Sequence, residues 1–491
     1  MGDLEGVRQR LSYLVDLGVD ALWLTPFYPS PMRDHGYDVA DHCDVDPLFG
    51  DLAAFDRLRA DAQVRGLKVI VDVVPNHTSN EHPWFREALA DPHSAARRRY
   101  HFRDGVGDGP PNNWQSVFGG PAWTREPAGG QWYLHLFDSG QPDLDWSNRE
   151  VHDEFLRILR FWLDRGVDGF RIDVAHSLYK HPELSDAPDP APGAEGAAAD
   201  NRHIWDRDEV LAVYEQWRIL LDGYDGDRML VGEVFLFDLP RIAQYVGDER
   251  LHQAFNFTVM RTGWGAAPLR ATIESALEHF HPGTWVLSNH DLVRHVTRYG
   301  GGSLGRRRGL AVTALLLGLP GSPYLYQGEE LGLDEADVPV ELRQDPAATR
   351  DGGLAGRDGC RTPMPWTAGS PGLGFTTGEP WLPFGADAAA LAVDLQVADP
   401  GSTLATYRRL LGARRSLLAA GGLGDHVEFL DSAPDVLAYR RGLLTVVLNA
   451  ASEPVEMTVA GAPSLLVSTA DGAEVAGGLL TVPAAATVWL G

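Results

Sequence analysis

Apolar strand segments alternate with helical segments along most of this chain, and the clear strands carry charged residues at their carboxyl ends. The predicted strands cover residues 20–25, 68–74, 167–174, 229–235, 253–257, 284–288 and 323–326. Apolar residues at helical spacing predict helices over residues 5–17, 51–65, 150–165, 208–221, 306–318 and 403–417. Strands that alternate with helices indicate a parallel sheet. Polar strand ends gathered on one side are typical of the (β/α)8 TIM barrel, an α/β fold.

Two stretches depart from this alternation and divide the chain into parts. Residues 78–149 are rich in Trp, Gly, Pro and Asn, and we expect them to form an inserted subdomain B after the third strand of the barrel. The catalytic barrel then comprises residues 1–77 and 150–420. Short apolar β segments replace helices in the last part of the chain, which predicts a C-terminal antiparallel β-sandwich over residues 421–491.

The charge balance excludes some classes of partner. The chain carries 42 Lys and Arg against 68 Asp and Glu, a net charge of −26, which argues against nucleic acid and anionic membranes as partners. No signal peptide and no membrane-spanning apolar run is evident, so we expect a cytoplasmic protein that binds a small molecule. Cys43 and Cys360 are expected to be free thiols. The sequence does not fix the oligomeric state.

The segment over residues 167–174 places two charges in a buried strand. Arg171 and Asp173 lie two residues apart, so their side chains leave the strand on the same face. A buried strand carries such charges only when they are paired or used in chemistry. We interpret Asp173 as a nucleophile that Arg171 keeps ionised and aimed, and a purely structural Arg–Asp pair is the alternative.

Other strand ends supply further polar groups. Glu233 lies among apolar residues, which favours the protonated form that a general acid needs, although a salt-bridged structural glutamate is the alternative. His290 and Asp291 follow another strand, and His77 follows a third, where a lone histidine is more often structural. The packing of a hydrophobic core does not require three carboxylates to converge in one place. A nucleophilic and an acidic carboxyl together are the equipment of retaining glycoside hydrolysis.

Four segments resemble, in order, the recurring regions of glycoside hydrolase family 13, the α-amylase family. They are DVVPNH at 72–77, GFRID at 169–173, GEV at 232–234 and SNHD at 288–291. QPDLDW at 141–146 is similar to a segment of the α-glucosidase and oligo-1,6-glucosidase branch. The resemblance spans nearly the whole chain. It implies that Asp173 is the nucleophile, Glu233 the acid/base and Asp291 the transition-state stabiliser, and that His77, His290 and Arg171 line the same glucose subsite.

Two more segments resemble parts of this branch and bear on specificity. DHGYD at 34–38 supplies Asp34 and Tyr37, which by resemblance meet the terminal glucose, with Tyr37 as a stacking platform. RDGCRTPMPW at 357–366 begins with Arg357, which by resemblance pairs with Asp34. Such a bridge closes the pocket behind the non-reducing end and implies exo action. A solvated loop charge is the alternative for Arg357.

The preferred linkage stays open. Val174 follows the nucleophile, and valine there accompanies α-1,6 tolerance in this branch, whereas other segments resemble maltose-active α-glucosidases. We therefore expect a broad retaining exo-α-glucosidase that acts on maltose-type oligosaccharides and possesses some transglucosylation activity. An oligo-1,6-glucosidase or a sucrose- or trehalose-active glucosyltransferring relative is the alternative. A non-catalytic sugar-binding or transporter-associated relative is disfavoured, because all three carboxylates are present.

One departure from the family concerns the start of the chain. The family begins with a first barrel strand and an Asp- and Asn-rich metal loop, whereas this chain begins within the tail of that loop. We therefore expect the first barrel strand to be missing from the sequence as given, with a start codon assigned too late as the simplest explanation. Of the expected ligands of a structural Ca²⁺ only Asp3 remains. No cofactor is required for the chemistry.

Overall fold

The computed structural model describes residues 1–127, 130–187, 201–280, 283–349, 356–461 and 463–491. Parallel strands form its centre, and those found among these residues match the seven predicted from the sequence. They are β1 (Ala21–Leu24), β2 (Lys68–Val73), β6 (Gly169–Ile172), β7 (Met229–Gly232), β8 (Gln253–Ala254), β9 (Thr284–Val286) and β10 (Ser322–Tyr324). The first five pair in the order β1-β2-β6-β7-β8, and β9 pairs with β10. Thr284 links the two sheets through bonds between its hydroxyl and the backbone of Ala254 and Asn256.

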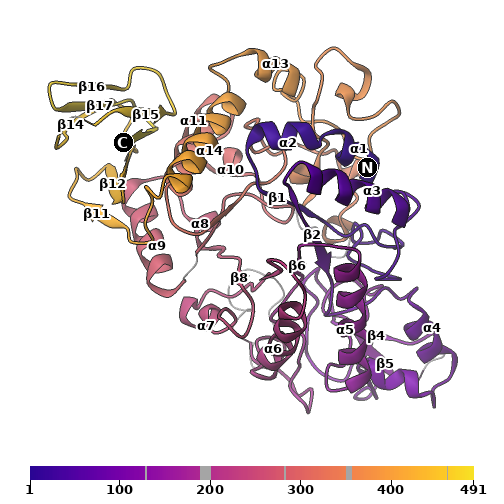
Figure 1. Cartoon of the computed structure of the whole chain (residues 1–491). Helices are drawn as coiled ribbons and strands as arrows, with labels where there is room; N and C mark the ends of the chain where they lie inside the picture. The colour runs from indigo at the N-terminus through magenta and orange to yellow at the C-terminus, as the bar shows by residue number, and fades with distance from the viewer. Residues whose placement is uncertain (128–129, 188–200, 281–282, 350–355, 462) are drawn as a thin grey trace.

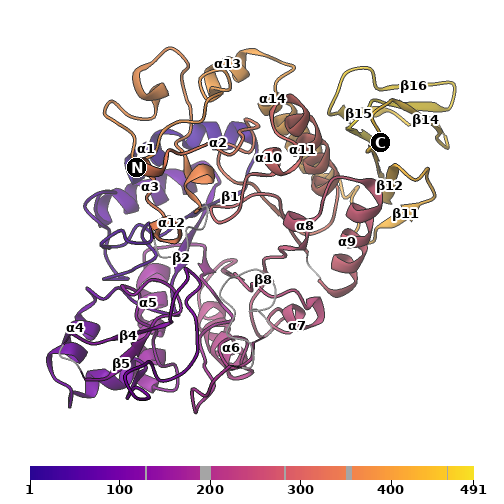
Figure 2. The ribbon, with the colours of Figure 1, turned by 180° about the vertical axis from the view of Figure 1, so that it is seen from behind.

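Helices surround these strands (Figures 1 and 2). The longer ones are α3 (Leu52–Val64), α5 (Arg149–Asp164), α6 (Glu209–Asp222), α9 (Ala266–His279), α11 (Gly302–Leu317) and α14 (Thr403–Ala419). The shorter ones are α7 (Leu239–Ala243), α8 (Thr258–Arg261), α10 (His295–Arg298) and α13 (Val393–Ala398). None of the described helices is both long enough and apolar enough to cross a membrane.

Local signals explain where several of these helices begin and end. Asp51 caps α3 by accepting a hydrogen bond from the backbone N–H of Ala54 at 2.6 Å. Gly66, with a φ of +77°, turns the chain from α3 into β2. Asn148 caps α5, and this helix buries Phe155 and Trp162 against the barrel core.

The helix predicted over residues 5–17 is wrong in one respect, because it is divided. Helix α1 (Leu4–Gln9) ends at Arg10, and α2 (Leu11–Leu17) follows directly. The Arg10 guanidinium lies 4.3 Å from the ring centre of Trp366. This tertiary contact with a residue far along the chain accompanies the break, and nothing in the local sequence indicates it.

The barrel strands differ in burial. Every residue of β6 is buried, whereas β10 is half-buried throughout and β1 has an exposed and two half-buried residues. Among the described residues β1 and β10 do not pair with one another, so the ring of strands is open between them.

The chain between β2 and α5 forms a small separate unit built around a three-stranded sheet, seen at the lower right of Figure 1. It contains α4 (Pro83–Ala90), the 3₁₀ helix η1 (Ala95–Arg99), β3 (Phe102–Arg103), β4 (Trp123–Arg125) and β5 (Trp132–Leu134). The strands are antiparallel in the order β3-β5-β4. An antiparallel bridge between His77 and Asp143 joins this part to the end of β2.

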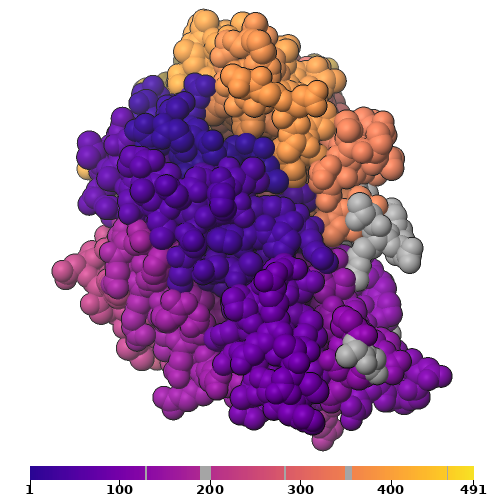
Figure 3. All heavy atoms as spheres, turned by 90° about the vertical axis from the view of Figure 1, so that its right-hand side faces the viewer, coloured from indigo at the N-terminus to yellow at the C-terminus, as the bar shows by residue number. Residues whose placement is uncertain are grey.

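The long loop region before α14 is irregular. It contains η2 (Val340–Leu342), α12 (Pro346–Thr349), η3 (Asp358–Arg361) and η4 (Pro371–Gly374). In Figure 3 this salmon-to-orange region lies against the indigo amino-terminal part of the chain. Residues far apart in sequence thereby reach the same side of the barrel.

The last part of the chain forms two antiparallel sheets. One has the order β11-β12-β13-β18-β15 and the other the order β14-β17-β16. Their bounds are β11 (Glu428–Leu430), β12 (Val436–Arg441), β13 (Leu444–Asn449), β14 (Val455–Thr458), β15 (Leu465–Ser468), β16 (Glu474–Ala476), β17 (Leu479–Val482) and β18 (Ala486–Leu490). This domain packs on α11, where Tyr439 and Trp489 donate hydrogen bonds to the carbonyls of Leu315 and Ala314.

A pair of glycine substitutions tests this packing. A Cβ at Gly318, which follows α11, would lie 2.2 Å from the Tyr439 hydroxyl, whereas a Cβ at Gly412 in α14 meets nothing within 4 Å. We expect Gly318→Ala to lower the free energy of unfolding by about 1–3 kcal/mol through overpacking. Gly412→Ala should instead raise it by up to about 1 kcal/mol, because alanine favours the helix. Chemical denaturation of both variants measures this, and equal effects would contradict the close approach at Gly318.

Candidate active site

Strand register brings the predicted site residues together. Strand β2 pairs with β6 so that Asp72 lies opposite Arg171. Strand β6 pairs with β7 so that Ile172 lies opposite Gly232, and the next residues in the two chains are Asp173 and Glu233. Three acidic side chains from three neighbouring strands therefore meet at the carboxyl ends of the strands, where this fold places its chemistry.

Arg171 is the centre of this group. Its side chain is almost fully buried, and its guanidinium contacts all three carboxylates. Nη1 donates to Asp173 Oδ1 at 2.6 Å and to Asp72 Oδ1 at 3.0 Å, and Nη2 lies 2.6 Å from Glu233 Oε2. The guanidinium also lies 5.0 Å from the ring centre of Trp23, a cation–π contact that completes its environment.

The expectation of an apolar environment for Glu233 is wrong. Its neighbours along the strand are apolar, but the adjacent strand supplies Arg171, and Glu233 Oε2 also accepts a hydrogen bond from the Val174 backbone at 3.1 Å. The sequence alternative, a salt-bridged glutamate, describes this structure better. Val174 reaches this position with a φ of +42°, which is unusual for a β-branched residue.

One guanidinium cannot neutralise three carboxylates, and this imbalance affects their protonation. Burial raises the pKa of Asp72 to about 6, although Arg171 opposes the shift. Burial also raises the pKa of Asp173 well above its ordinary value against the pull of Arg171, and the charges of Glu233 and Asp72 add to the rise. Burial and the surplus of negative charge thus act in the same direction on Asp72 and Asp173, and both favour the protonated form of these two coupled carboxyls.

A second arginine organises the other side of the site. Arg357 Nη2 donates to Asp34 Oδ1 at 2.7 Å, and Nη1 donates to Asp291 Oδ1 at 3.0 Å. The predicted bridge between Asp34 and Arg357 is thus present, and the alternative of a solvated loop charge is wrong. Asp34 is buried, and its Oδ2 accepts a hydrogen bond from Gln141 at 3.1 Å.

Asp291 receives a different electrostatic environment from the other carboxyls. Burial alone would raise its pKa, but the charges of Arg357 and Arg361 hold the pKa of Asp291 below its usual range. Arg361 Nη2 donates to Asp291 Oδ1 at 3.0 Å. Asp291 is therefore ionised at neutral pH. Its side chain is 26% exposed.

Tyr37 and His290 connect the two arginine centres. The Tyr37 hydroxyl donates to Asp72 Oδ2 at 3.1 Å and lies 2.8 Å from His290 Nε2. The two rings stack with their centres 5.4 Å apart and their planes 2° apart. Burial lowers the pKa of His290 to about 3, so its imidazole is neutral. The Tyr37 ring is therefore covered by His290 on one face, and the Arg171 guanidinium carbon lies 5.7 Å from its ring centre.

His77 lies at the edge of the same site. Its Nε2 lies 3.1 Å from the Tyr37 carbonyl oxygen and 3.1 Å from Gln141 Nε2. Gln141, which is fully buried, therefore joins His77 to Asp34. Gln141 lies in the motif at 141–146, but the sequence alone does not indicate this role.

Two further residues were missed for different reasons. Arg361 lies four residues after Arg357 in the motif at 357–366, so its place in this motif could have indicated a role at the same site. Asp345 is fully buried against Arg357, with 2.7 Å between its Oδ2 and Nε, and no local pattern distinguishes it from other loop aspartates.

Asp3 does not resemble a metal ligand in this structure. Its Oδ1 accepts the backbone N–H of Gly6 at 2.6 Å and so caps α1. Within the described part of the chain, no three His, Cys, Asp or Glu side chains are grouped so that they could hold a metal ion. Because Ca²⁺ takes six to eight oxygen ligands, the residues present do not fit a calcium site here.

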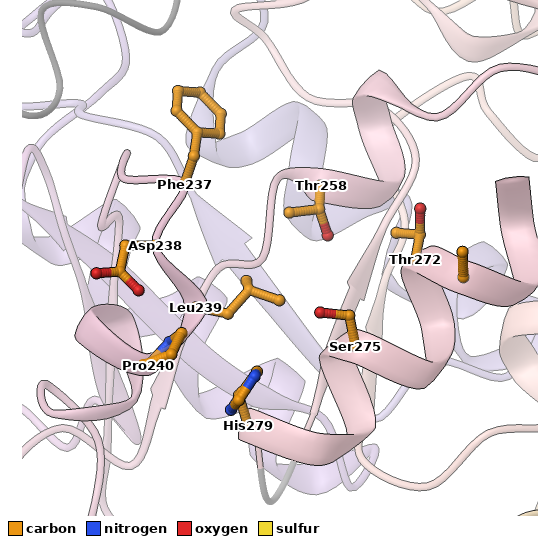
Figure 4. A pocket seen from close by; sticks show the side chains of 9 residues that line it. Phe237, Asp238, Leu239, Pro240, Thr258, Thr272, Ser275 and His279 are labelled. Carbon is orange, nitrogen blue, oxygen red and sulfur yellow. The ribbon is translucent and has the colours of Figure 1, made fainter.

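The hollow drawn in Figure 4 lies away from these residues. It has a volume of about 490 Å³, and Leu239, Thr258, Ser275 and His279 are among the residues of α7, α8 and α9 that line it. None of the predicted site residues lines it, so we place the chemistry at the strand ends, where the charges converge.

The comparisons with known proteins agree with this geometry. A family profile described as the α-amylase catalytic domain matches residues 1–421. The chain belongs to the α-amylase family.

Similar proteins in this family have related names. The chain is 39% identical over 470 residues to a Rhizobium meliloti (strain 1021) protein named "Probable alpha-glucosidase", and the match covers 90% of this chain and 83% of that protein. It is 37% identical over 479 residues to the trehalose-6-phosphate hydrolase of Escherichia coli (strain K12), covering 90% of this chain and 84% of that protein. The solved structure of the alpha-glucosyl transfer enzyme XgtA superposes with a TM-score of 0.90 at 41% identity, covering 99% of this chain and 94% of that one.

The buried imidazole of His77 predicts a specific pH dependence. Burial lowers its pKa from 6.5 to about 4. Between these values the unfolded chain binds a proton that the folded chain does not, so His77 makes the protein less stable as the pH falls below 6.5. We therefore expect His77→Gln to lose less stability than the parent on going from pH 7 to pH 5, by about 2 kcal/mol.

The measurement is chemical denaturation at the two pH values, with the exposed His93 replaced by Gln as the control. The His93 variant should follow the parent protein. A His77 variant that also follows the parent at both pH values would show that His77 is protonated in the folded state.

Proposed function

We propose that the chain is a retaining, exo-acting α-glucosidase that releases α-glucose from the non-reducing end of maltose-type oligosaccharides and transfers some of it to other acceptors. The observation that carries this proposal is the shared guanidinium of Arg171, whose two terminal nitrogens hold Asp173 and Glu233. Carboxyl groups bound to one guanidinium lie close together. Retaining glycosidases keep their two carboxyls about 5 Å apart, whereas inverting enzymes leave room for a water molecule between them.

The chemistry then divides into two steps. In the first, a carboxylate oxygen of Asp173 attacks the anomeric carbon while Glu233 gives its proton to the glycosidic oxygen. The carbon–oxygen bond breaks, and the leaving sugar departs as an alcohol. In the second, the Glu233 carboxylate takes a proton from water, whose oxygen attacks the anomeric carbon and displaces Asp173. Asp291 remains ionised and stabilises the positive charge that develops on the sugar in both steps.

The excess of negative charge around Arg171 favours the single proton that this scheme requires. The scheme begins with an ionised Asp173 and a protonated Glu233, so the group must hold a proton near neutral pH. Three carboxylates around one guanidinium provide that excess of negative charge. Substrate binding displaces water from this group, which strengthens the effect of each remaining charge.

Exo action is supported by the wall that Arg357 and Asp34 form. Their bond at 2.7 Å joins loops that follow the beginning and the end of the barrel. A guanidinium paired with a carboxylate can still offer donors and an acceptor to the outer hydroxyls of a sugar. We propose that His77, His290 and Tyr37 contact the same glucose unit.

Two alternatives share the same site. Val174 favours α-1,6 linkages by resemblance, and the relatives include a trehalose-6-phosphate hydrolase and an α-glucosyl transfer enzyme. An oligo-1,6-glucosidase and a sucrose- or trehalose-active enzyme use the same catalytic residues and differ in the leaving group they accept. Product profiles on maltose, isomaltose, sucrose and trehalose distinguish them.

The division into domains is also a proposal. We infer that residues 1–77 and 150–420 act as the catalytic barrel, that residues 78–149 form the inserted subdomain, and that residues 421–491 form the C-terminal domain. The small sheet β3-β5-β4 and the two C-terminal antiparallel sheets, of which the five-stranded one packs on α11, support these boundaries.

Replacing the acid tests the first step. Glu233→Gln should lower the rate on maltose by on the order of 10²–10⁴, because the amide cannot protonate the leaving sugar. The loss should be smaller for p-nitrophenyl α-glucoside, whose leaving group needs little protonation. Azide should partly restore turnover of that substrate and give the α-glucosyl azide.

The control is Asp173→Asn, which should be inactive on both substrates and should give no α-glucosyl azide, because it cannot form the glycosyl ester. An equal loss on both substrates for Glu233→Gln, without an azide effect, would exclude Glu233 as the acid.

Replacing Arg357 tests the pocket wall. Arg357→Ala leaves Asp34 without its cation and opens the glucose site, so kcat/KM for maltose should fall by on the order of 10²-fold. The melting temperature should change much less. Arg343, which within the described part of the same loop region donates to the backbone carbonyl of Val338, is the control and should tolerate alanine. An Arg357→Ala protein that is unfolded, or one with unchanged kcat/KM, would contradict the exo assignment.

A further inference from the structure

Asp345 is a fully buried carboxylate that the chemistry proposed above does not use. It precedes α12 in the loop region before α14. Its Oδ2 accepts hydrogen bonds from Arg357 Nε at 2.7 Å and from the Arg357 backbone at 2.5 Å, and its Oδ1 accepts one from Nη2 at 3.1 Å. Burial alone would raise its pKa, but Arg357 holds the pKa of Asp345 at about 2, so this side chain is an anion.

These contacts determine the direction of the other Arg357 donors. A guanidinium is planar, so a carboxylate that binds Nε and one Nη2 hydrogen from the same side fixes its plane. The remaining donors then point to Asp34 at 2.7 Å and to Asp291 at 3.0 Å. The aromatic ring of Phe118, 5.0 Å from the guanidinium carbon, further limits its movement.

We propose that Asp345 is a positioning residue, which orients Arg357 so that one guanidinium holds both Asp34 and Asp291 in their working geometry. This inference rests on the proposed function, since it assigns Asp34 to sugar binding and Asp291 to transition-state stabilisation. Asp345 itself does not touch the sugar. Its Oδ1 also accepts the backbone N–H of Ala347 at 3.0 Å, but its contact with the proposed site is the one through Arg357.

The local backbone does not depend on the Asp345 side chain alone. The backbone N–H groups of Gln344 and Asp345 both donate to Asp358 Oδ2, at 2.9 and 3.1 Å. The loop at Asp345 is therefore anchored by a second carboxylate. Asp345→Asn, which keeps the size of the side chain and one acceptor oxygen, should leave this anchor in place.

The test is a double-mutant cycle on maltose hydrolysis that combines Asp345→Asn with Arg357→Ala. Asp345→Asn alone should lower kcat/KM by on the order of 10²-fold, because a misplaced catalytic environment has a cost of that size. In the Arg357→Ala background the same change should alter kcat/KM by no more than about twofold, since its route of action is gone. The two single variants should also divide their losses between kcat and KM in the same way.

A matched control removes a buried carboxylate charge elsewhere. Glu126 pairs with Arg97 at 3.0 Å, and both side chains are nearly as buried as Asp345. Glu126→Gln should change kcat/KM little, even if it lowers the melting temperature. This separates the effect of positioning from a general loss of stability.

The possible outcomes separate this inference from the proposed function. A parent protein that does not hydrolyse maltose or any other α-glucoside would contradict the proposed function. An active parent in which Asp345→Asn is unchanged, or in which its loss is equally large with and without Arg357, would contradict the positioning role alone. If Asp345→Asn does not fold, Asp345→Glu, which keeps the charge but shifts it by one methylene, is used in the same cycle with the same criteria.

Discussion

The ion-pair group around Arg171 is the interaction on which the rest of the site depends. Its guanidinium is buried at the end of β6 and is within 3.0 Å of carboxylates from β2, β6 and β7. Removing the cation would leave three carboxyl groups without the positive charge they share in a low-dielectric interior, where breaking even one buried pair costs about 3–5 kcal/mol. The parallel register of the strands is therefore tied to the placement of these charges, and the reactive carboxyls cannot move independently of one another.

Arg357 repeats this arrangement with residues from loops instead of strands. It binds Asp34, Asp291 and Asp345, and the stacked pair Tyr37 and His290 connects this second centre to the first. The two centres differ in purpose. The first has three carboxyls around one guanidinium, which favours protonation within the group, whereas around the second Arg361 adds another positive charge that keeps Asp291 ionised. The proposed acid, Glu233, and an ionised carboxylate, Asp291, can thus be present in the same site.

The sequence predicted most of this structure where the signal is local. Strand positions followed from apolar runs that end in charged residues, and the bridge between Asp34 and Arg357 followed from family motifs. Predictions failed where a distant contact decides the result. The break at Arg10 accompanies its contact with Trp366, and the environment of Glu233 comes from Arg171 on the adjacent strand. No sequence pattern indicates a role for Asp345, because its role depends on its contact with Arg357 in the folded protein.

The bond between Asp34 and Arg357 joins residues that are 323 positions apart in the chain. During synthesis the amino-terminal half of the proposed glucose site leaves the ribosome long before its other half exists. At about 5–20 residues per second, a delay on the order of tens of seconds separates the two. A nascent chain can therefore form much of its barrel and still be unable to hold a sugar. The appearance of activity during translation would thus report the arrival of the late loops rather than the folding of the barrel.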